Sequence, residues 1–312
     1  MIVSALRNTN SISTILVTSV LFFGNFLLNI GEVFNESDVP VSKMVLSWGS
    51  VLCIVLLLNG YTQKFKFVGL GDGIAGAVFL SFMFGLKDPH LFYRELMGLC
   101  LILIVNIRLI SLHNTPKNLL REFEIGLLLG LVMFISPGFL VVGIMFLIGL
   151  ALVVSFTWRD FLAPVLGVFW VFLIKYCYHF VFEEGPINEF FHLSISLPVF
   201  DFNWNIEMIK WMVLSLFVCM IFLRIFKVIE KRSVRVRVNY RIWIWTFVCL
   251  LLSLLFFQRA FSLLYMVQWL ALLPCAIFSI EYFKLESSLK GRWKLELVFF
   301  CLMVVQLGIR FV

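Results

Sequence analysis

Apolar runs long enough to cross a lipid bilayer recur from Ser11 to the end of the chain, and only short polar segments separate them. Such runs place the backbone in hydrocarbon, where an unsatisfied N–H or C=O group is very costly. A helix satisfies these groups internally, and the runs lack the period-two alternation of a membrane-spanning barrel. The sequence therefore predicts an all-α fold, a polytopic transmembrane helical bundle.

The apolar runs predict about nine to eleven spans. In the eleven-span version the helices cover residues 11–30, 44–60, 73–87, 96–112, 125–136, 138–156, 163–182, 207–227, 242–257, 263–283 and 295–312. The third and fifth runs are short for a hydrocarbon core of roughly 30 Å. The fifth and sixth are divided only by Ser136, Pro137 and Gly138. The span count therefore depends on these short runs.

Composition agrees with this architecture and excludes a soluble fold. Of the 312 residues, 62% are hydrophobic and 14% are charged, and the mean hydropathy is +1.04. No polar segment is long enough to form a separate domain. Residues 1–312 are therefore expected to form a single integral membrane domain.

The distribution of basic residues predicts the orientation. With the N-terminus cytoplasmic and eleven spans, 18 of the 25 Lys and Arg residues fall on the cytoplasmic side, as the positive-inside rule requires. Anionic lipid headgroups account for the basic pI of about 9.1, so no nucleic-acid partner is expected. Residues 183–206 then form an extracytoplasmic loop, whose mixture of acids and aromatics suggests an interfacial helix.

Residues 228–241 form a basic cytoplasmic loop in this topology. Valines at 234, 236 and 238 alternate with its basic residues, which suits lying against anionic lipid or pairing with the strand of another chain, although the positive-inside rule alone explains most of the basic residues. At two other helix ends, Asn106 with Arg108 and Trp158-Arg159-Asp160 are interpreted as interface anchors, with Arg159 and Asp160 also capping the following helix. The predicted headgroup contacts are Lys231, Arg232, Arg235, Arg237, Arg241 and Arg159.

A polar stripe inside the seventh span is the best intramembrane candidate for a functional site. Lys175, His179 and Glu183 recur every four residues, with Tyr178 beside them, so they share one helical face. In one interpretation the stripe lines a hydrated cavity, in which His179 relays protons or Lys175 holds an anionic headgroup. In the other, Lys175 reaches outward to the interface past a belt of Tyr and His.

The first outer loop carries two candidate acids, Glu36 and Asp38. Their E-x-D spacing is similar to that of polyprenyl-phosphate-dependent glycosyltransferases, whose acid acts as a base or metal ligand just outside the first span. The loop is much shorter than the first loop of that class, and no second acidic loop pairs with it convincingly.

Glycine spacing has a structural interpretation. The segment Gly69–Gly76 contains a G-x-G-x-x-G pattern, but it follows no buried strand, so Gly73, Gly76 and Ala77 are interpreted as a turn and a close helix contact. Gly126 and Gly130 form a G-x-x-x-G with the same interpretation. No Cys or His spacing suits a metal site, and no cofactor is expected.

Three stretches together carry a family resemblance: Met1–Asn10, Asn106–Leu112 followed by Phe123–Gly126, and Trp158–Gly167. The chain resembles an uncharacterised family of multi-pass inner-membrane proteins of Bacteroidota that carries a domain-of-unknown-function label. The resemblance implies a location in the cytoplasmic (inner) membrane of a diderm bacterium. It supplies no activity and no catalytic residues.

These observations favour a non-catalytic role. We expect an integral membrane subunit or assembly factor of an envelope-biogenesis or protein-export complex, which contacts lipids and other membrane proteins through its small-residue helix faces and outer loop. The alternatives are an enzyme or carrier that handles polyprenyl-linked glycan, based on Glu36, Asp38 and the Lys175 stripe, and a small-solute transporter. A transporter needs polar groups at the membrane midplane on interrupted helices.

Overall fold

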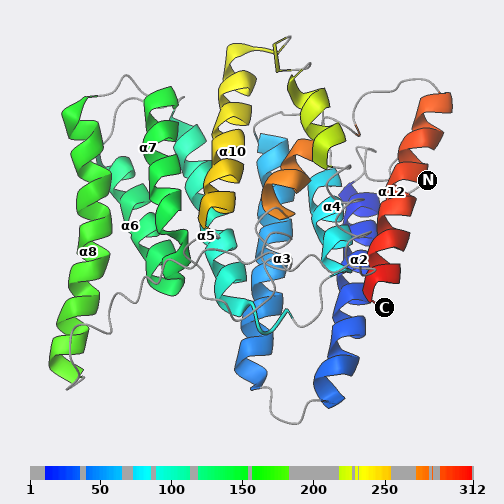
Figure 1. Ribbon diagram of the computed structural model, residues 1–312, viewed down its shortest axis with the longest axis horizontal. Coiled ribbons are helices and arrows are strands. Elements are labelled where there is room, and N and C mark those ends of the chain that lie inside the picture. The colour runs from blue at the N-terminus through cyan, green and yellow to red at the C-terminus, as the bar shows by residue number, and fades with distance from the viewer. Residues whose placement is uncertain are drawn as a thin grey trace, which may run out of the picture. The chain divides into compact units, whose positions relative to one another are not determined.

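The computed structural model describes residues 11–35, 40–64, 73–85, 89–112, 119–153, 157–182, 218–226, 229–230, 232–253, 272–280, 283 and 289–310. Within these ranges every regular element is a helix, and no strand occurs (Figure 1). The predicted all-α class is confirmed for this part of the chain.

The helices follow the apolar runs of the sequence. They are α2 (Ser11–Asn35), α3 (Val41–Lys64), α4 (Ile74–Met83), α5 (Tyr93–Leu112), α6 (Leu119–Ile135), the 3₁₀ helix η1 (Pro137–Val141), α7 (Val142–Val153), α8 (Trp158–Phe182), α10 (Val234–Ser253) and α12 (Leu289–Arg310). Residues 218–226 and 272–280 are also helical. Each predicted span overlaps one of these helical segments.

Three of the described helices are long and apolar enough to cross a membrane. They are Val41–Thr62 of α3, Tyr93–Leu112 of α5 and Trp158–Val181 of α8. The predicted third span is shorter than expected, because its helix α4 has only 10 residues. At 1.5 Å per residue, α4 is about 15 Å long, half of a hydrocarbon core.

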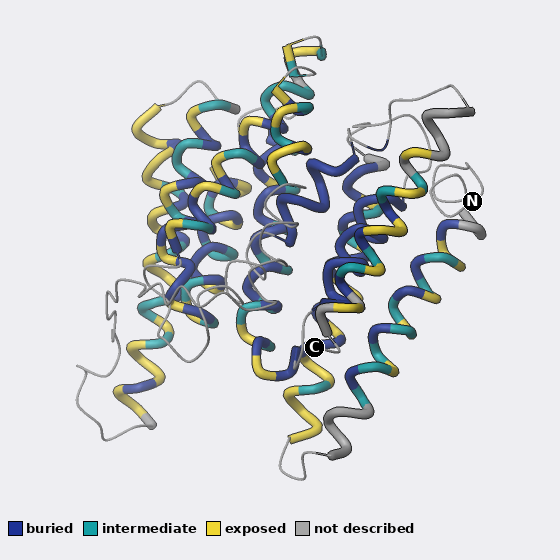
Figure 2. Tube along the Cα trace, turned by 45° about the vertical axis from the view of Figure 1, so that its right-hand side comes forward, coloured by how far each residue is buried: buried dark blue, intermediate teal, exposed yellow. Residues whose placement is uncertain are grey.

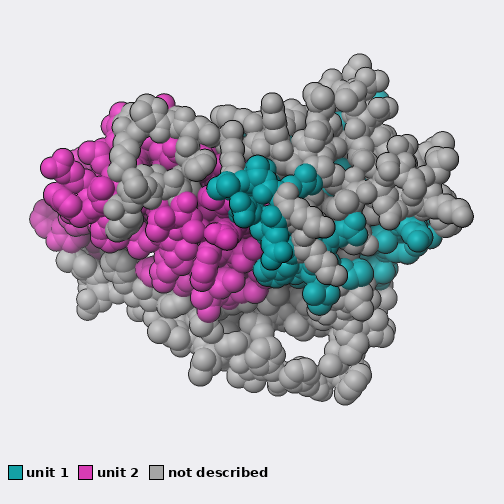
Figure 3. Space-filling model, turned by 90° about the horizontal axis from the view of Figure 1, so that it is seen from above, with its two compact units in different colours: residues 1–96, 201–237, 272–312 teal, residues 97–200, 238–271 magenta. Residues whose placement is uncertain are grey.

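The chain divides into two compact units, which Figure 3 colours separately. Unit 1 consists of residues 1–96, 201–237 and 272–312, and unit 2 of residues 97–200 and 238–271. Unit 1 contains α2, α3, α4 and α12, whereas unit 2 contains α6, η1, α7, α8 and most of α5 and α10.

Unit 1 is built around α4. This helix packs against α2, α3 and α12, and all ten of its residues are buried, so it appears dark blue along its length in Figure 2. Helices α2 and α3 also touch each other directly, because Phe22 and Phe26 stand edge-on against Trp48 at ring-centroid distances of 5.6 and 5.3 Å. A short apolar helix thus forms the centre of this unit.

Unit 2 depends on the close packing of α6 against α8. A β-carbon added at Gly126 would lie 2.6 Å from the Cα of Pro164, and one added at Gly167 would lie 2.5 Å from the carbonyl oxygen of Phe123. One turn further, a β-carbon at Gly130 would lie 2.8 Å from Cγ2 of Val171. The G-x-x-x-G of α6 therefore allows close helix approach, as predicted.

These contacts also fix the relative direction of α6 and α8. Gly126 meets Pro164 and Gly130 meets Val171, so residue numbers rise together along both helices, which are parallel. The chain must return between them, and η1 and α7 make that return. The break predicted at Pro137 is confirmed: α6 ends at Ile135, Ser136 is extended, and Pro137 starts the 3₁₀ helix.

One local prediction differs from the structure. The alternation of Val234, Val236 and Val238 with basic residues suggested pairing with the strand of another chain within a loop over residues 228–241, but α10 begins at Val234 and includes this stretch. A helix satisfies the backbone hydrogen bonds that an isolated strand would leave without partners, so α10 begins within the basic segment.

Candidate functional site

The polar stripe of α8 is only partly assembled as the sequence predicted. Lys175 is half-buried, with Nζ 5.1 Å from the centroid of the Phe134 ring at the end of α6. His179, one turn further along α8, is 9% exposed, whereas Tyr178 is 58% exposed. Lys175 and His179 therefore lie on the better buried face of α8, and Tyr178 faces away from it.

Three of the predicted site residues lie outside the described residues. They are Glu183, the last member of the stripe, and the outer-loop acids Glu36 and Asp38. The loop predicted over residues 183–206 also lies outside them. The cavity and interface interpretations of the stripe, and the similarity to glycosyltransferases, therefore stay predictions.

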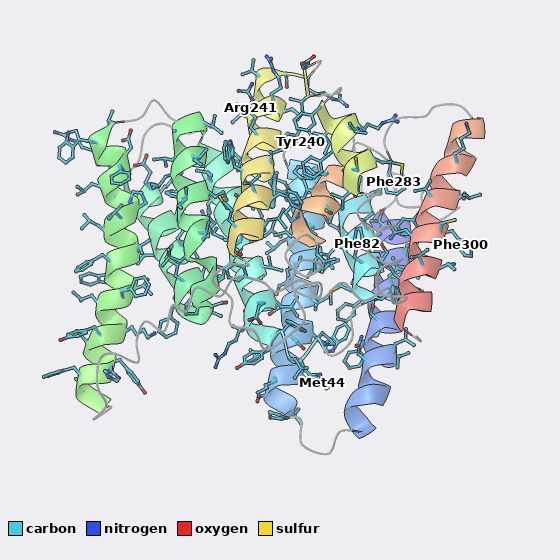
Figure 4. The ribbon with its side chains drawn as sticks, in the orientation of Figure 1. Met44, Phe82, Tyr240, Arg241, Phe283 and Phe300 are labelled. Carbon is cyan, nitrogen blue, oxygen red and sulfur yellow. The ribbon has the colours of Figure 1, made fainter. Side chains whose placement is uncertain are left out.

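The basic segment meets the start of α10. Arg232 and Arg237 are half-buried and Arg241 is exposed. Figure 4 labels Arg241 beside the fully buried Tyr240 in the first half of this helix. Lys231 and the side chain of Arg235 lie outside the described residues. Of these arginines only Arg241 is exposed, as a headgroup contact requires, so the remaining predicted headgroup contacts of this segment stay predictions.

The start of α8 has the capping predicted for Asp160. The carboxylate Oδ2 of Asp160 accepts a hydrogen bond of 3.0 Å from the backbone N–H of Thr157, the residue before the helix. Next to it, the guanidinium carbon of Arg159 lies 5.6 Å from the centroid of the exposed Trp158 ring. An exposed Trp–Arg pair at a helix end is typical of a membrane interface.

The interpretation of Asn106 as an interface anchor is wrong. Its side chain is fully buried in unit 2, where Nδ2 lies 3.3 Å from Oγ1 of Thr246 on α10. Thr246 Oγ1 in turn lies 2.8 Å from the carbonyl oxygen of Ile242 and 3.0 Å from Sδ of Met145 on α7. Asn106 therefore links α5 to α10. Its neighbour Arg108 is exposed, as an anchor should be.

Gly76, in the first turn of α4, lies at a close contact with another helix. A β-carbon at Gly76 would lie 2.6 Å from Oδ1 of Asn59 and 3.1 Å from Cγ1 of Val55, both on α3. Like the glycines between α6 and α8, Gly76 is covered by another helix of the same chain. Helices of the same chain therefore already cover these glycine faces. Contacts with a partner protein, which were expected at the small-residue faces, have to use other surfaces.

A polar row along α2 is the main feature that sequence reasoning missed. Thr14, Thr18, Asn25 and Asn29 are 7%, 8%, 0% and 2% exposed, and their spacing of four, seven and four residues places them on one face. The signal was present in the sequence, because two Asn and two Thr recur at helical spacing within an apolar run. The contact of Asn25 with α4 depends on the fold.

The outer face of α8 is unusually exposed. In the apolar 18-residue stretch that marks α8 as a candidate span, only 11% of the residues are buried, compared with 56% in the corresponding stretch of α5. Phe169 is 58% exposed and Trp170 is 51% exposed. Trp170 lies twelve residues from each end of the 25-residue helix, about 18 Å from either terminus. This face therefore presents a large aromatic surface at the middle of a membrane-length helix.

Groups of three or more His, Cys, Asp or Glu side chains that could hold a metal ion do not occur in the described ranges. No family model, curated protein or solved structure matches the chain.

Proposed function

We propose that this protein is a non-catalytic integral membrane subunit or assembly factor of a bacterial envelope-biogenesis or protein-export complex. It crosses the cytoplasmic membrane as a polytopic bundle of about nine to eleven spans with a cytoplasmic N-terminus. Its location in the inner membrane of a diderm bacterium follows from the family resemblance. Lipids and at least one other membrane protein are its partners.

The observation that carries the proposal is the exposed aromatic face of α8. Tryptophan collects at the two membrane interfaces, where its indole N–H reaches water or headgroups. Trp158, at the helix start and 67% exposed, fits that pattern, but Trp170 lies at the helix midpoint. A lipid tail offers the indole N–H no acceptor, whereas a neighbouring protein can supply one. Large aromatics are also enriched in protein interfaces.

The position of α8 supports the same proposal. Its inner face is occupied by α6 through Gly126, Gly130 and Gly167, and that contact holds it in place. A helix attached firmly on one side presents its other side in a fixed orientation, which suits docking of a transmembrane helix from a partner.

Site-specific photo-cross-linking in native membranes tests this proposal. A benzophenone amino acid at Phe169 leaves Trp170 in place, and the same residue at Leu223, 61% exposed in unit 1, is the matched control. We expect position 169 to give a discrete protein adduct, identified by mass spectrometry, that Trp170→Leu weakens. Position 223 should give no such adduct.

Other outcomes of the cross-linking decide against the proposal. If position 169 gives only lipid adducts, or the same products as position 223, α8 has no partner protein. If two differently tagged copies of the chain cross-link to each other, the face is a self-association surface instead of a site for a different subunit.

A further inference from the structure

Three side chains of the polar row of α2 donate hydrogen bonds to the backbone of their own helix. Thr18 Oγ1 donates to the carbonyl oxygen of Thr14 at 2.8 Å, and Asn29 Nδ2 donates to that of Asn25 at 2.8 Å. Asn25 Nδ2 likewise lies 3.2 Å from the carbonyl oxygen of Leu21. In Asn25 the amide nitrogen is engaged in this way, so the side-chain atom left to interact with anything else is its acceptor oxygen, Oδ1.

Asn25 also joins α2 to α4. Its Nδ2 donates a 2.9 Å hydrogen bond to the carbonyl oxygen of Leu80. Both atoms facing Nδ2 are carbonyl oxygens, so the chemistry of the contacts fixes which end of the carboxamide is nitrogen. The other end, Oδ1, is buried and has no hydrogen-bond partner in the described part of the chain. Asn25 as a whole is 0% exposed.

The partner of Asn25 lies at a special point of α4. The helix ends at Met83, so Leu80 belongs to the last four residues, whose carbonyls lack complete intrahelical partners. The C-terminal end of a helix carries a partial negative charge of about half an elementary charge. All of α4 is buried, so this charge and the Asn25 oxygen lie together in a protein interior, where a polar group needs a partner.

We propose that Asn25 Oδ1 and the carbonyl oxygen of Leu80, at the C-terminal end of α4, contribute to a binding site for a monovalent alkali cation, Na⁺ or K⁺. Alkali and alkaline-earth cations take oxygen ligands, and Ca²⁺ and Mg²⁺ add carboxylates. The oxygen ligands offered here, the amide oxygen of Asn25 and the carbonyl of Leu80, carry partial charges and suit one positive charge. Half-length helices whose C-terminal ends meet ion sites are a known device of membrane proteins.

This site is independent of the partner surface of α8. It uses residues of unit 1 only, and a bound cation would serve equally a static subunit or a transporter. Failure of the cross-linking experiment therefore leaves the cation site standing, and failure of the cation experiment leaves the partner surface standing.

Cation-dependent thermal unfolding of the purified protein in lipid nanodiscs tests the proposal. NaCl and KCl are each titrated against choline chloride at constant ionic strength. A site that binds only the folded state raises Tm in a saturable way, and we expect a rise of about 2–5 °C at saturation for one of the two cations. If neither NaCl nor KCl changes the Tm of the wild-type protein, the proposed site is wrong. An Asn25 oxygen that contacts only water would give that result.

Three variants locate the effect. Asn25→Ala should abolish the shift, whereas Ser279→Ala should keep it. Ser279 is a suitable control because it is 0% exposed in unit 1 and donates to the carbonyl oxygen of Ala276 in its own segment. An equal shift in Asn25→Ala and the wild type overturns the assignment to Asn25.

Asn25→Asp keeps the test decisive if the alanine variant does not fold. The carboxylate places a full negative charge beside the Leu80 carbonyl and removes the donor that held it, so the cation becomes the bridge between them. The NaCl or KCl concentration at half-maximal shift should fall at least threefold. An unchanged or higher midpoint concentration contradicts the proposal.

Discussion

Helices α4 and α8 are both apolar, yet the protein uses them in opposite ways. The 10 residues of α4 are all buried, whereas only 11% of the residues in the apolar 18-residue stretch of α8 are buried. Helix α4 is too short to cross a bilayer and is surrounded by α2, α3 and α12. Helix α8 is long enough to cross, and it presents one face outward. Apolar composition alone therefore does not say whether a helix contacts lipid or protein.

The polar residues follow the same division. In unit 1, Asn25 and Asn29 lie along the core and Asn25 contacts the backbone of α4. In α8, Lys175 lies beside Phe134 at the rim of the α6 contact, and Tyr178 is exposed. A buried amide in a membrane bundle has to be matched by a specific partner, whereas an exposed Tyr or Lys near a helix end reaches the interface.

The largest expected effect compares one phenylalanine from each helix. Phe79 of α4 is 0% exposed and Phe169 of α8 is 58% exposed. Phe79→Ala leaves a cavity in the centre of unit 1 and should lower the free energy of unfolding by about 3 kcal/mol. Phe169→Ala should change it by less than about 0.5 kcal/mol. Chemical denaturation in mixed micelles measures both, and equal losses would remove the contrast between α4 and α8.

A second substitution probes how α8 is held. Gly126→Ala forces a β-carbon against the backbone of Pro164, which cannot rotate out of the way as a side chain can. We expect a loss near the upper end of about 1–3 kcal/mol. Gly60→Ala is the matched control, because nothing lies within 4 Å of its added β-carbon. That control should be neutral or slightly stabilising, since alanine favours the helix. If both variants unfold alike, the glycine contact does not hold α8.

The corresponding glycine of unit 1 should be more tolerant. A β-carbon at Gly76 meets the side chains of Asn59 and Val55, and these can shift by changing rotamer. Gly76→Ala should therefore lower the free energy of unfolding by about 1 kcal/mol, less than Gly126→Ala. Thermal melts of the two variants side by side give the order. A larger loss at Gly76 would mean that α3 and α4 are packed as rigidly as α6 and α8.

The smallest expected effect concerns the hydrogen bond between Asn106 and Thr246. Thr246→Val keeps the shape of the side chain and removes the oxygen that Asn106 Nδ2 contacts at 3.3 Å. Hydrogen bonds between transmembrane helices contribute about 0.6 kcal/mol on average, so the loss should be of that size. A double-mutant cycle with Asn106→Leu measures the coupling directly. A coupling energy of zero would show that the contact stabilises nothing.

Sequence reasoning predicted the helices well because apolar runs and breakers act locally. Pro137 ends one helix and starts the next turn because its ring fixes φ and removes the backbone N–H, which are local properties of the residue. Gly126 and Gly130 predicted a close helix contact, but their spacing could not predict which helix makes that contact. Asn106 shows the limit most clearly, because its partner Thr246 is 140 residues away. Asn25 likewise meets Leu80 only once α2 and α4 have packed.

The parallel arrangement of α6 and α8 imposes an order on biosynthesis. Gly126 leaves the ribosome well before Pro164, the residue that covers it, because η1 and α7 come between them in the chain. Until α8 arrives, the glycine face of α6 stands open to any small-residue helix in the bilayer. A chaperone or insertase that shields this face would prevent mispairing during that interval.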